Sequence, residues 1–138
     1  MKFLFDASSL FQLIKNFSEE RILRLLGDNC ILDLTKYEVG NALWKEQVQH
    51  RGIGENEFRE FLNLLRKVIQ STKILSVDAE KLPDVAEVAA RERMTFYDAS
   101  YIAMAKVHGV TLITEDSELT RAASKYIKAT PLGRIKPA

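Results

Sequence analysis

The sequence predicts an α/β fold, a three-layer sandwich in which helices cover both faces of a central, mostly parallel sheet of four or five strands. Short apolar runs of strand length alternate along the chain with longer segments in which apolar residues recur every three or four positions. No repeat, linker or low-complexity stretch interrupts this alternation, and 138 residues suit one domain. We therefore expect a single domain over residues 1–130 and a C-terminal tail over residues 131–138.

The first half of the chain carries two short apolar runs and the longest helical patterns. After the first run, the polar side chains of residues 6–9 can cap a helix that begins near Leu10. Thr35 can cap the first long helix in the same way, and Gly27 ends the helix before it. The expected elements, in order, are a strand at 3–5, a helix from about 10, a helix at 18–27, a strand at 30–34, a helix at 35–52 and a helix carrying the apolar face 58–69 up to about 71.

The second half repeats the alternation with shorter helices. Pro83 is compatible with the first turn of a helix, and Gly109 is a favourable residue after the end of one. The expected elements are a strand at 74–77, a helix at 79–93, a helix at 97–107, a strand at 110–114, a short helix at 118–125 and an edge strand at 126–127.

Composition points to a cytoplasmic protein and leaves its binding partner open. The charges nearly balance, with 20 Lys and Arg against 19 Asp and Glu, which neither favours nor excludes a nucleic-acid ligand. Cys30 is the single cysteine and lies in an apolar run, which predicts a buried thiol in a reducing compartment. Asp6 interrupts the apolar start too early for a signal peptide, and no stretch has the length of a membrane span.

Four acids follow or neighbour the predicted strands in a way that brings them to one edge of the sheet. Asp6 and Asp116 come after the first and last of the four main strands, while Glu38 and Asp98 lie in the first turns of helices. Ligands of open parallel sheets bind beyond the carboxyl ends of the strands. Each acid alone is equally explained by a turn or by the helix dipole. Together they predict an acidic site.

Each of these acids also lies in a longer motif. The motifs are Phe5-Asp6-Ala7-Ser8, Tyr37-Glu38-Val39-Gly40-Asn41-Ala42-Leu43, Tyr97-Asp98-Ala99-Ser100-Tyr101-Ile102-Ala103-Met104-Ala105 and Leu112-Ile113-Thr114-Glu115-Asp116. In order and spacing they resemble the PIN-domain nucleases and, within them, the VapC-type toxins of bacterial and archaeal toxin–antitoxin pairs. The resemblance spans about residues 2–129, so it implies a PIN-like fold for nearly the whole chain.

The resemblance implies a catalytic acidic metal site. Oxygen ligands without a His or Cys cluster favour Mg²⁺ or Mn²⁺, and a divalent cation removes the repulsion between neighbouring carboxylates. Asp6, Asp98 and Asp116 are the expected metal ligands, directly or through water, and Glu38 is either a ligand or the base that orients the attacking water. The implied supporting residues are Ser8 and Thr114, through their hydroxyls, and Asn41 as a neighbouring polar group.

The implied function is a Mg²⁺- or Mn²⁺-dependent endoribonuclease that hydrolyses RNA phosphodiesters and leaves a 5′-phosphate and a 3′-hydroxyl. The expected partners are the RNA substrate, a cognate VapB-type antitoxin and a second copy of the chain in a homodimer, without a membrane. The long helices between residues 35 and 71 offer apolar surface for both protein partners. A stand-alone RNA-processing nuclease is the alternative within this class.

Two other classes of protein fit the sequence less well than a nuclease does. An aspartate-based phosphotransfer enzyme lacks support because Asp6-Ala7-Ser8 has no second Asp and no Lys ends the 110–114 strand. A non-catalytic PIN-like RNA-binding or adaptor domain is the other alternative, although none of the four acids is missing. A mechanism based on a pair of histidines is disfavoured because His50 and His108 lie near helix ends away from the acids.

Overall fold

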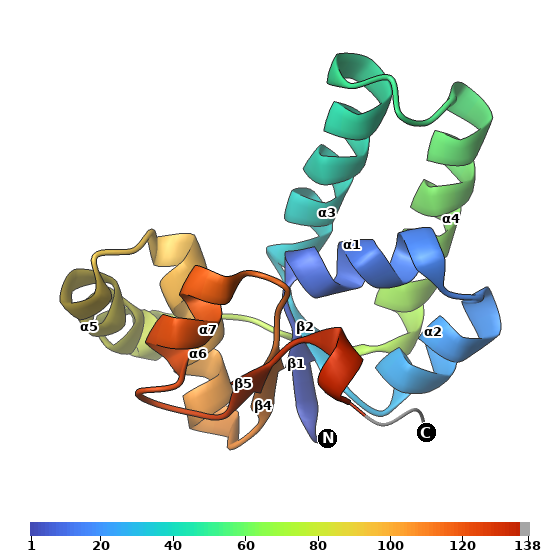
Figure 1. Cartoon of the computed structure of the whole chain (residues 1–138). Helices are drawn as coiled ribbons and strands as arrows, with labels where there is room; N and C mark the ends of the chain where they lie inside the picture. Colours follow the sequence, from blue (N-terminus) through green and yellow to red (C-terminus); the bar gives the residue numbers. More distant parts are fainter. Residues whose placement is uncertain (136–138) are drawn as a thin grey trace.

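A computed structural model describes residues 1–135 and shows a five-stranded, all-parallel sheet (Figure 1). The strand order is β3-β2-β1-β4-β5, so the chain leaves β1 in one direction to form β2 and β3 and returns on the other side to form β4 and β5. The point at which this order reverses lies between β1 and β4. The strands are β1 (Phe3–Phe5), β2 (Cys30–Leu32), β3 (Lys73–Leu75), β4 (Thr111–Ile113) and β5 (Ala129–Thr130).

Helices cover both faces of the sheet, which confirms the predicted three-layer α/β sandwich. In Figure 1, α3 and α4 extend side by side beyond the sheet, and α5, α6 and α7 lie on the opposite side of it. The helices are α1 (Ala7–Asn16), α2 (Glu19–Gly27), α3 (Thr35–Trp44), α4 (Glu55–Ser71), α5 (Leu82–Glu92), α6 (Phe96–His108) and α7 (Ser117–Ala123), with a π-helical turn at Lys45–Gln49 and 3₁₀ turns at Ala79–Lys81 and Leu132–Arg134.

The core has two halves because successive strand residues point to opposite faces. Leu4 and Leu112 pack with α5, α6 and α7, whereas Phe5 and Ile113 pack with α1 to α4. All four side chains are fully buried. The register pairs Phe5 with Ile113, so the residues that follow β1 and β4 emerge next to each other at the carboxyl edge of the sheet.

Side-chain caps determine where the helices begin and correct two expectations. α1 begins at Ala7, earlier than the expected start near Leu10, because the Asp6 carboxylate accepts a hydrogen bond from the Ser9 backbone amide. Thr35 is the first residue of α3 and not its cap, and its hydroxyl instead accepts from the Leu32 amide. The expected helix over 35–52 ends as an α-helix at Trp44 and continues as the π-helical turn.

The chain after α7 differs from the sequence prediction. No strand forms at 126–127, because the amides of Tyr126 and Ile127 both donate to the Ala123 carbonyl and close the turn after the helix. The edge strand is β5, which pairs with β4 two residues later.

The described part of the expected tail is held against the domain. Leu132 and Ile135 pack on the core beneath α1 to α4, and the Leu132 amide donates to the Glu115 carboxylate at 2.8 Å. The tail is therefore packed on the domain up to residue 135, while its last residues, 136–138, lie outside the described part. The boundary at 130 stays a prediction. No helix within residues 1–135 is long and apolar enough to cross a membrane.

Candidate active site

The four predicted acids gather around the carboxyl edge of the sheet, near the point where the strand order reverses. Asp6 directly follows β1, and Asp116 follows β4 after two intervening residues. Glu38 lies in the first turn of α3 and Asp98 in the first turn of α6. Loops and helix N-termini converge at such a reversal, and open α/β sheets bind their ligands there.

Asp6 is the buried centre of the group, with only 4% of its surface exposed. Its Oδ1 accepts from the Ser8 hydroxyl at 2.7 Å and from the Ser9 amide at 2.9 Å, and its Oδ2 accepts from the Thr114 hydroxyl. Burial raises the pKa of Asp6, and these hydrogen bonds oppose that rise by stabilising the charged form. The carboxylate is thereby held in one orientation.

The two hydroxyls on Asp6 are themselves oriented by backbone amides. The Glu115 amide donates to Ser8 Oγ at 2.9 Å, and the Asp116 amide donates to Thr114 Oγ1 at 3.1 Å. Each hydroxyl therefore keeps its own proton available for Asp6. The structure therefore places both hydroxyls in contact with the Asp6 carboxylate, and their supporting role in catalysis stays a prediction.

Glu38 is held by a tyrosine that the sequence reasoning did not single out. The Tyr101 hydroxyl donates to Glu38 Oε1 at 2.7 Å and lies 2.8 Å from the Thr35 hydroxyl, which accepts from the Leu32 amide. Tyr101 and Thr35 are both buried. The chain of hydrogen bonds runs from β2 through α3 and α6 to the carboxylate. One available signal was the spacing of Tyr101 three residues after Asp98, which places both on one side of a helix.

The charges of the four acids act on one another. Burial raises the pKa of Glu38, and the negative charges of Asp98 and Asp6 raise it further, while the Tyr101 hydrogen bond lowers it. Burial also raises the pKa of Asp98, and the charge of Asp116 adds to that rise. Such mutual shifts require the carboxylates to be neighbours. The acidic group therefore carries a repulsion that a cation would relieve.

Besides belonging to the group of four acids, Asp116 caps a helix. Its Oδ1 caps α7 by accepting from the amides of Glu118 at 2.9 Å and Leu119 at 3.2 Å. The cap fixes the direction of the carboxylate, and Oδ2 has no hydrogen-bond partner among residues 1–135. Asn41, in contrast, is exposed on α3 and its side chain makes no hydrogen bond within the described residues. No hydrogen bond within the described residues links it to the four acids, so its supporting role stays a prediction.

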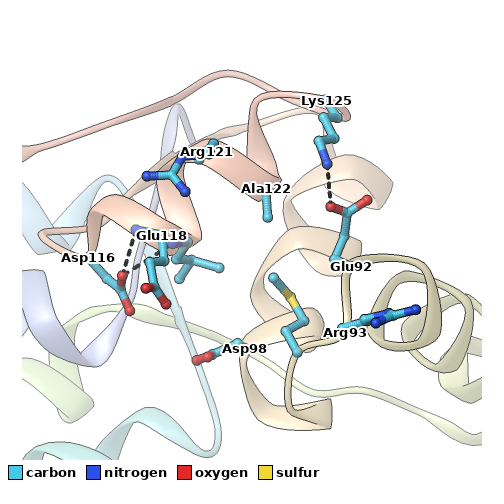
Figure 2. Close-up of a pocket in the computed structure, with 10 residues that line it drawn as sticks. Glu92, Arg93, Asp98, Asp116, Glu118, Arg121, Ala122 and Lys125 are labelled. Carbon is cyan, nitrogen blue, oxygen red and sulfur yellow. Dashed lines mark hydrogen bonds and ion pairs between the residues drawn. The ribbon is translucent and has the colours of Figure 1, made fainter.

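Asp98 and Asp116 open onto a cleft of about 300 Å³ between α7 and the end of α5 (Figure 2). Its walls carry both signs of charge, and the apolar side chains among them come from α7 and from Met94 in the connection between α5 and α6. The lining residues are Glu92, Arg93, Met94, Asp98, Asp116, Glu118, Leu119, Arg121, Ala122 and Lys125.

The donor set fits a hard divalent cation bound partly through water. The four side chains offer only carboxylate oxygens, which suit Mg²⁺ or Mn²⁺ better than softer metals. Within residues 1–135 no three Asp, Glu, His or Cys side chains form a closed ligand cluster. Mg²⁺ commonly uses one or two carboxylates and keeps several waters, so it does not require such a cluster.

Comparison with known proteins identifies the family of this chain. The PIN domain family model matches residues 3–125. Exonuclease VapC9 of Pyrobaculum aerophilum is 37% identical over 119 residues, which cover 86% of this chain and 84% of the relative. Ribonuclease VapC3 of the same organism is 35% identical over 124 residues, covering 86% of this chain and 92% of the relative.

Solved structures share the fold. The crystal structure of PAE2754 from Pyrobaculum aerophilum has a TM-score of 0.78 and 34% identity, over 96% of this chain and 85% of that one. DNA-bound VapBC from Salmonella typhimurium has a TM-score of 0.65 at 21% identity, over 95% of this chain and 98% of that one, and so shows the fold alone. On the match of nearly its whole length, the chain belongs to the PIN-domain family, with VapC-type nucleases among its relatives.

Proposed function

We propose that this protein is a VapC-type ribonuclease that hydrolyses RNA phosphodiester bonds within the strand, with Mg²⁺ or Mn²⁺ at the acidic group. The observation that carries the proposal is the convergence of four carboxylates, from four separate elements, at the reversal point of the sheet. Relatives named as an exonuclease and a ribonuclease support nuclease chemistry. One name specifies an exonuclease and the other leaves the mode of cleavage open, so the test below separates cleavage at RNA ends from cleavage within the strand.

Asp6, Asp98 and Asp116 are the proposed ligands of the cation. When bound, a divalent cation supplies a lowered pKa for a coordinated water and offsets negative charge that develops on the phosphate. Ser8 and Thr114 keep Asp6 in the orientation seen here, and the Asp116 amide orients Thr114 in turn. The protein thus presents its proposed ligands on rigid strand and helix ends.

Glu38 is the proposed base or water-orienting group. Its carboxylate is half-buried, and the hydrogen bond from Tyr101 holds one oxygen while the other remains available to a water. In hydrolysis, the water oxygen forms a new bond to phosphorus, the bond from phosphorus to the 3′ oxygen breaks, and the 3′ oxygen takes a proton. The products are a 5′-phosphate and a 3′-hydroxyl.

A VapB-type antitoxin and a second copy of the chain are the proposed protein partners. A fold neighbour was solved as a VapBC complex, which supports a pairing of this kind. On the α3 side, Trp44 and Val48 are 42% and 51% exposed and lie four residues apart, so they offer apolar surface for a partner. A stand-alone RNA-processing enzyme would need neither partner.

The deciding experiment compares linear and circular RNA as substrates. Purified protein is incubated with each RNA in Mg²⁺, Mn²⁺ or EDTA, beside the variants Asp98→Asn and Asp84→Asn. Asp84 is a matched control because it also lies in the first turn of a helix, α5, but outside the acidic group. We expect metal-dependent cutting of both RNAs by wild type and Asp84→Asn, with a loss of at least about 100-fold in Asp98→Asn.

The other outcomes are equally informative. Cleavage of linear RNA alone would replace the endonuclease by an exonuclease. Folded protein that binds RNA but cuts neither substrate in either metal would indicate the non-catalytic adaptor and overturn the proposal. Analysis of the product ends checks the predicted 5′-phosphate.

A further inference from the structure

Thr35 is a fully buried polar residue that does not cap the helix it begins. A hydroxyl at a helix N-terminus commonly accepts a hydrogen bond from a free backbone amide of the first turn. In α3 the capping position is occupied by Leu34, whose side chain makes no such bond. The Thr35 hydroxyl instead contacts the Leu32 amide at 3.2 Å and the Tyr101 hydroxyl at 2.8 Å. Its contacts therefore lead to α6 and not to its own helix.

The number of protons in this chain of hydrogen bonds fixes its direction. The Tyr101 hydroxyl has one proton and donates it to Glu38 Oε1 at 2.7 Å, because an ionised carboxylate can only accept. Tyr101 therefore accepts from the Thr35 hydroxyl, whose oxygen already accepts from the Leu32 amide. The chain runs from the backbone amide through Thr35 and Tyr101 to Glu38, and each of its bonds polarises the next.

The same chain links α3 to α6. Thr35 and Glu38 lie three positions apart on one side of α3, and Tyr101 lies three positions after Asp98 on α6. Within residues 1–135, no other hydrogen bond and no ion pair joins these two helices. The two bonds to the Tyr101 hydroxyl thus hold Glu38 in place relative to the helix that carries Asp98.

This chain of hydrogen bonds cannot carry a proton away from Glu38. It ends at the Leu32 amide, which is a donor with no free electron pair for a further proton. Thr35 and Tyr101 are both buried, so neither hydroxyl exchanges protons directly with solvent. A proton that Glu38 takes from water leaves by another route, and the two hydroxyls orient the carboxylate.

We propose that Thr35 is a positioning residue of the proposed nuclease, which acts through Tyr101 to keep one oxygen of Glu38 fixed and leave the other free for the attacking water. The inference rests on the proposed function, because it takes Glu38 as the base or water-orienting group. Without the Thr35 hydroxyl, the Tyr101 oxygen has no donor and the Leu32 amide has no acceptor. The Tyr101 hydroxyl is then less firmly directed towards Glu38.

The first test compares variants with and without the hydroxyl. RNA cleavage in Mg²⁺ and urea unfolding are measured for wild type, Thr35→Val, Thr35→Ser and Thr72→Val, with Thr35→Ala in place of Thr35→Val if the latter does not fold. Thr72 is the matched control, because its hydroxyl donates to the Asn29 carbonyl at 3.1 Å beside the start of β3, at the opposite edge of the sheet from the acids. We expect Thr35→Val to lower kcat about fivefold at unchanged KM, the factor that corresponds to one neutral hydrogen bond of ordinary strength. Thr35→Ser should restore kcat to within about twofold of wild type, because it keeps the hydroxyl. Thr72→Val should lower stability without lowering kcat.

A double-mutant cycle shows whether Thr35 acts through Tyr101. In the Tyr101→Phe protein Glu38 has already lost its donor, so adding Thr35→Val should lower kcat by less than about twofold more. Wild-type kcat in Thr35→Val, or an equal fivefold loss in both backgrounds, would overturn the positioning role. A wild type that cuts no RNA would refute the nuclease, and the same cycle is then measured on the free energy of unfolding. Additive losses there would overturn the action of Thr35 through Tyr101, and coupled losses would retain it.

Discussion

Asp6, the most enclosed of the four acids, is oriented by the hydroxyl of Ser8, two residues further on, and by that of Thr114, which the pairing of β1 with β4 brings beside it, whereas Glu38 depends on a hydroxyl from another helix. Tyr101 is 1% exposed and donates its only proton to Glu38. A buried hydrogen bond of this kind holds the carboxylate in place and offsets the free energy lost when the polar hydroxyl is removed from water. Tyr101 is thus a positioning residue for the proposed base.

Removing that hydroxyl should separate positioning from binding. Tyr101→Phe leaves the ring in place but deprives Glu38 and Thr35 of a partner, so we expect about 1–2 kcal/mol less stability and about tenfold lower kcat at unchanged KM. Tyr126→Phe is the control, because its hydroxyl also bonds a glutamate, Glu92, but outside the acidic group. Equal kcat in the two variants would argue against the positioning role.

Cys30 provides a prediction on alkaline stability. The thiol is fully buried and donates to the Phe3 carbonyl at 3.3 Å, and burial raises its pKa from 9.0 to about 11. Since the folded pKa is the higher one, folding favours the protonated thiol, and that stability is lost as the pH rises from 9 towards 11. Between pH 8 and pH 10, wild type should therefore lose about 1 kcal/mol more than Cys30→Ala. Urea unfolding at both pH values measures the difference, and parallel losses would contradict it.

At the scale of elements, the helix N-termini carry the acids to the carboxyl edge. Thr95 caps α6 by accepting from the amide of Asp98 itself at 3.1 Å, so one side chain starts the helix and fixes the backbone of a proposed metal ligand. Ser18 caps α2 in the same manner through the Arg21 amide, far from the acids. In both caps a hydroxyl accepts a hydrogen bond from the amide three residues later, but only the Thr95 cap lies beside one of the four acids.

Substitutions at the two cap residues, Thr95 and Ser18, can distinguish a loss of stability from a loss of RNA cleavage. Thr95→Ala and Ser18→Ala should each lower the free energy of unfolding by about 1 kcal/mol, because each leaves a helix amide without its partner. Only Thr95→Ala should also lower RNA cleavage, through the less firmly held Asp98. Chemical denaturation and cleavage rates measured side by side check both parts. A similar activity loss in both variants would show that stability alone is responsible.

At the scale of the whole molecule, α3 and α4 extend beyond the sheet (Figure 1). Apolar side chains of these two helices and of the π-helical turn between them are exposed, Trp44, Val48 and Leu62 among them. If this side forms the proposed homodimer, Val48→Glu should produce monomers, because a charge buried in an interface without a partner is costly. Val107→Glu on α6 is the control, with a similarly exposed valine on the other face of the sheet. Sedimentation velocity at several concentrations distinguishes the species, and a monomeric wild type would exclude the dimer.

Local patterns in the sequence determined the α/β class, four of the five strands and the positions of the acids. Apolar periodicity depends only on neighbouring residues, so it located β1 to β4 and the major helices. The acids were found because their positions after strands and in first helical turns are also local features. Their proposed roles came from the family resemblance.

Only the tertiary structure decided the features that depend on pairing between distant segments. β5 has two residues and becomes a strand through its partner β4, so its own sequence gives little signal. Tyr101 reaches Glu38 across 63 positions of the chain, and Arg93 and Arg121 share a cleft although they come from different helices. Periodicity contains no information on which helices meet, because that is determined by packing on the two faces of the sheet.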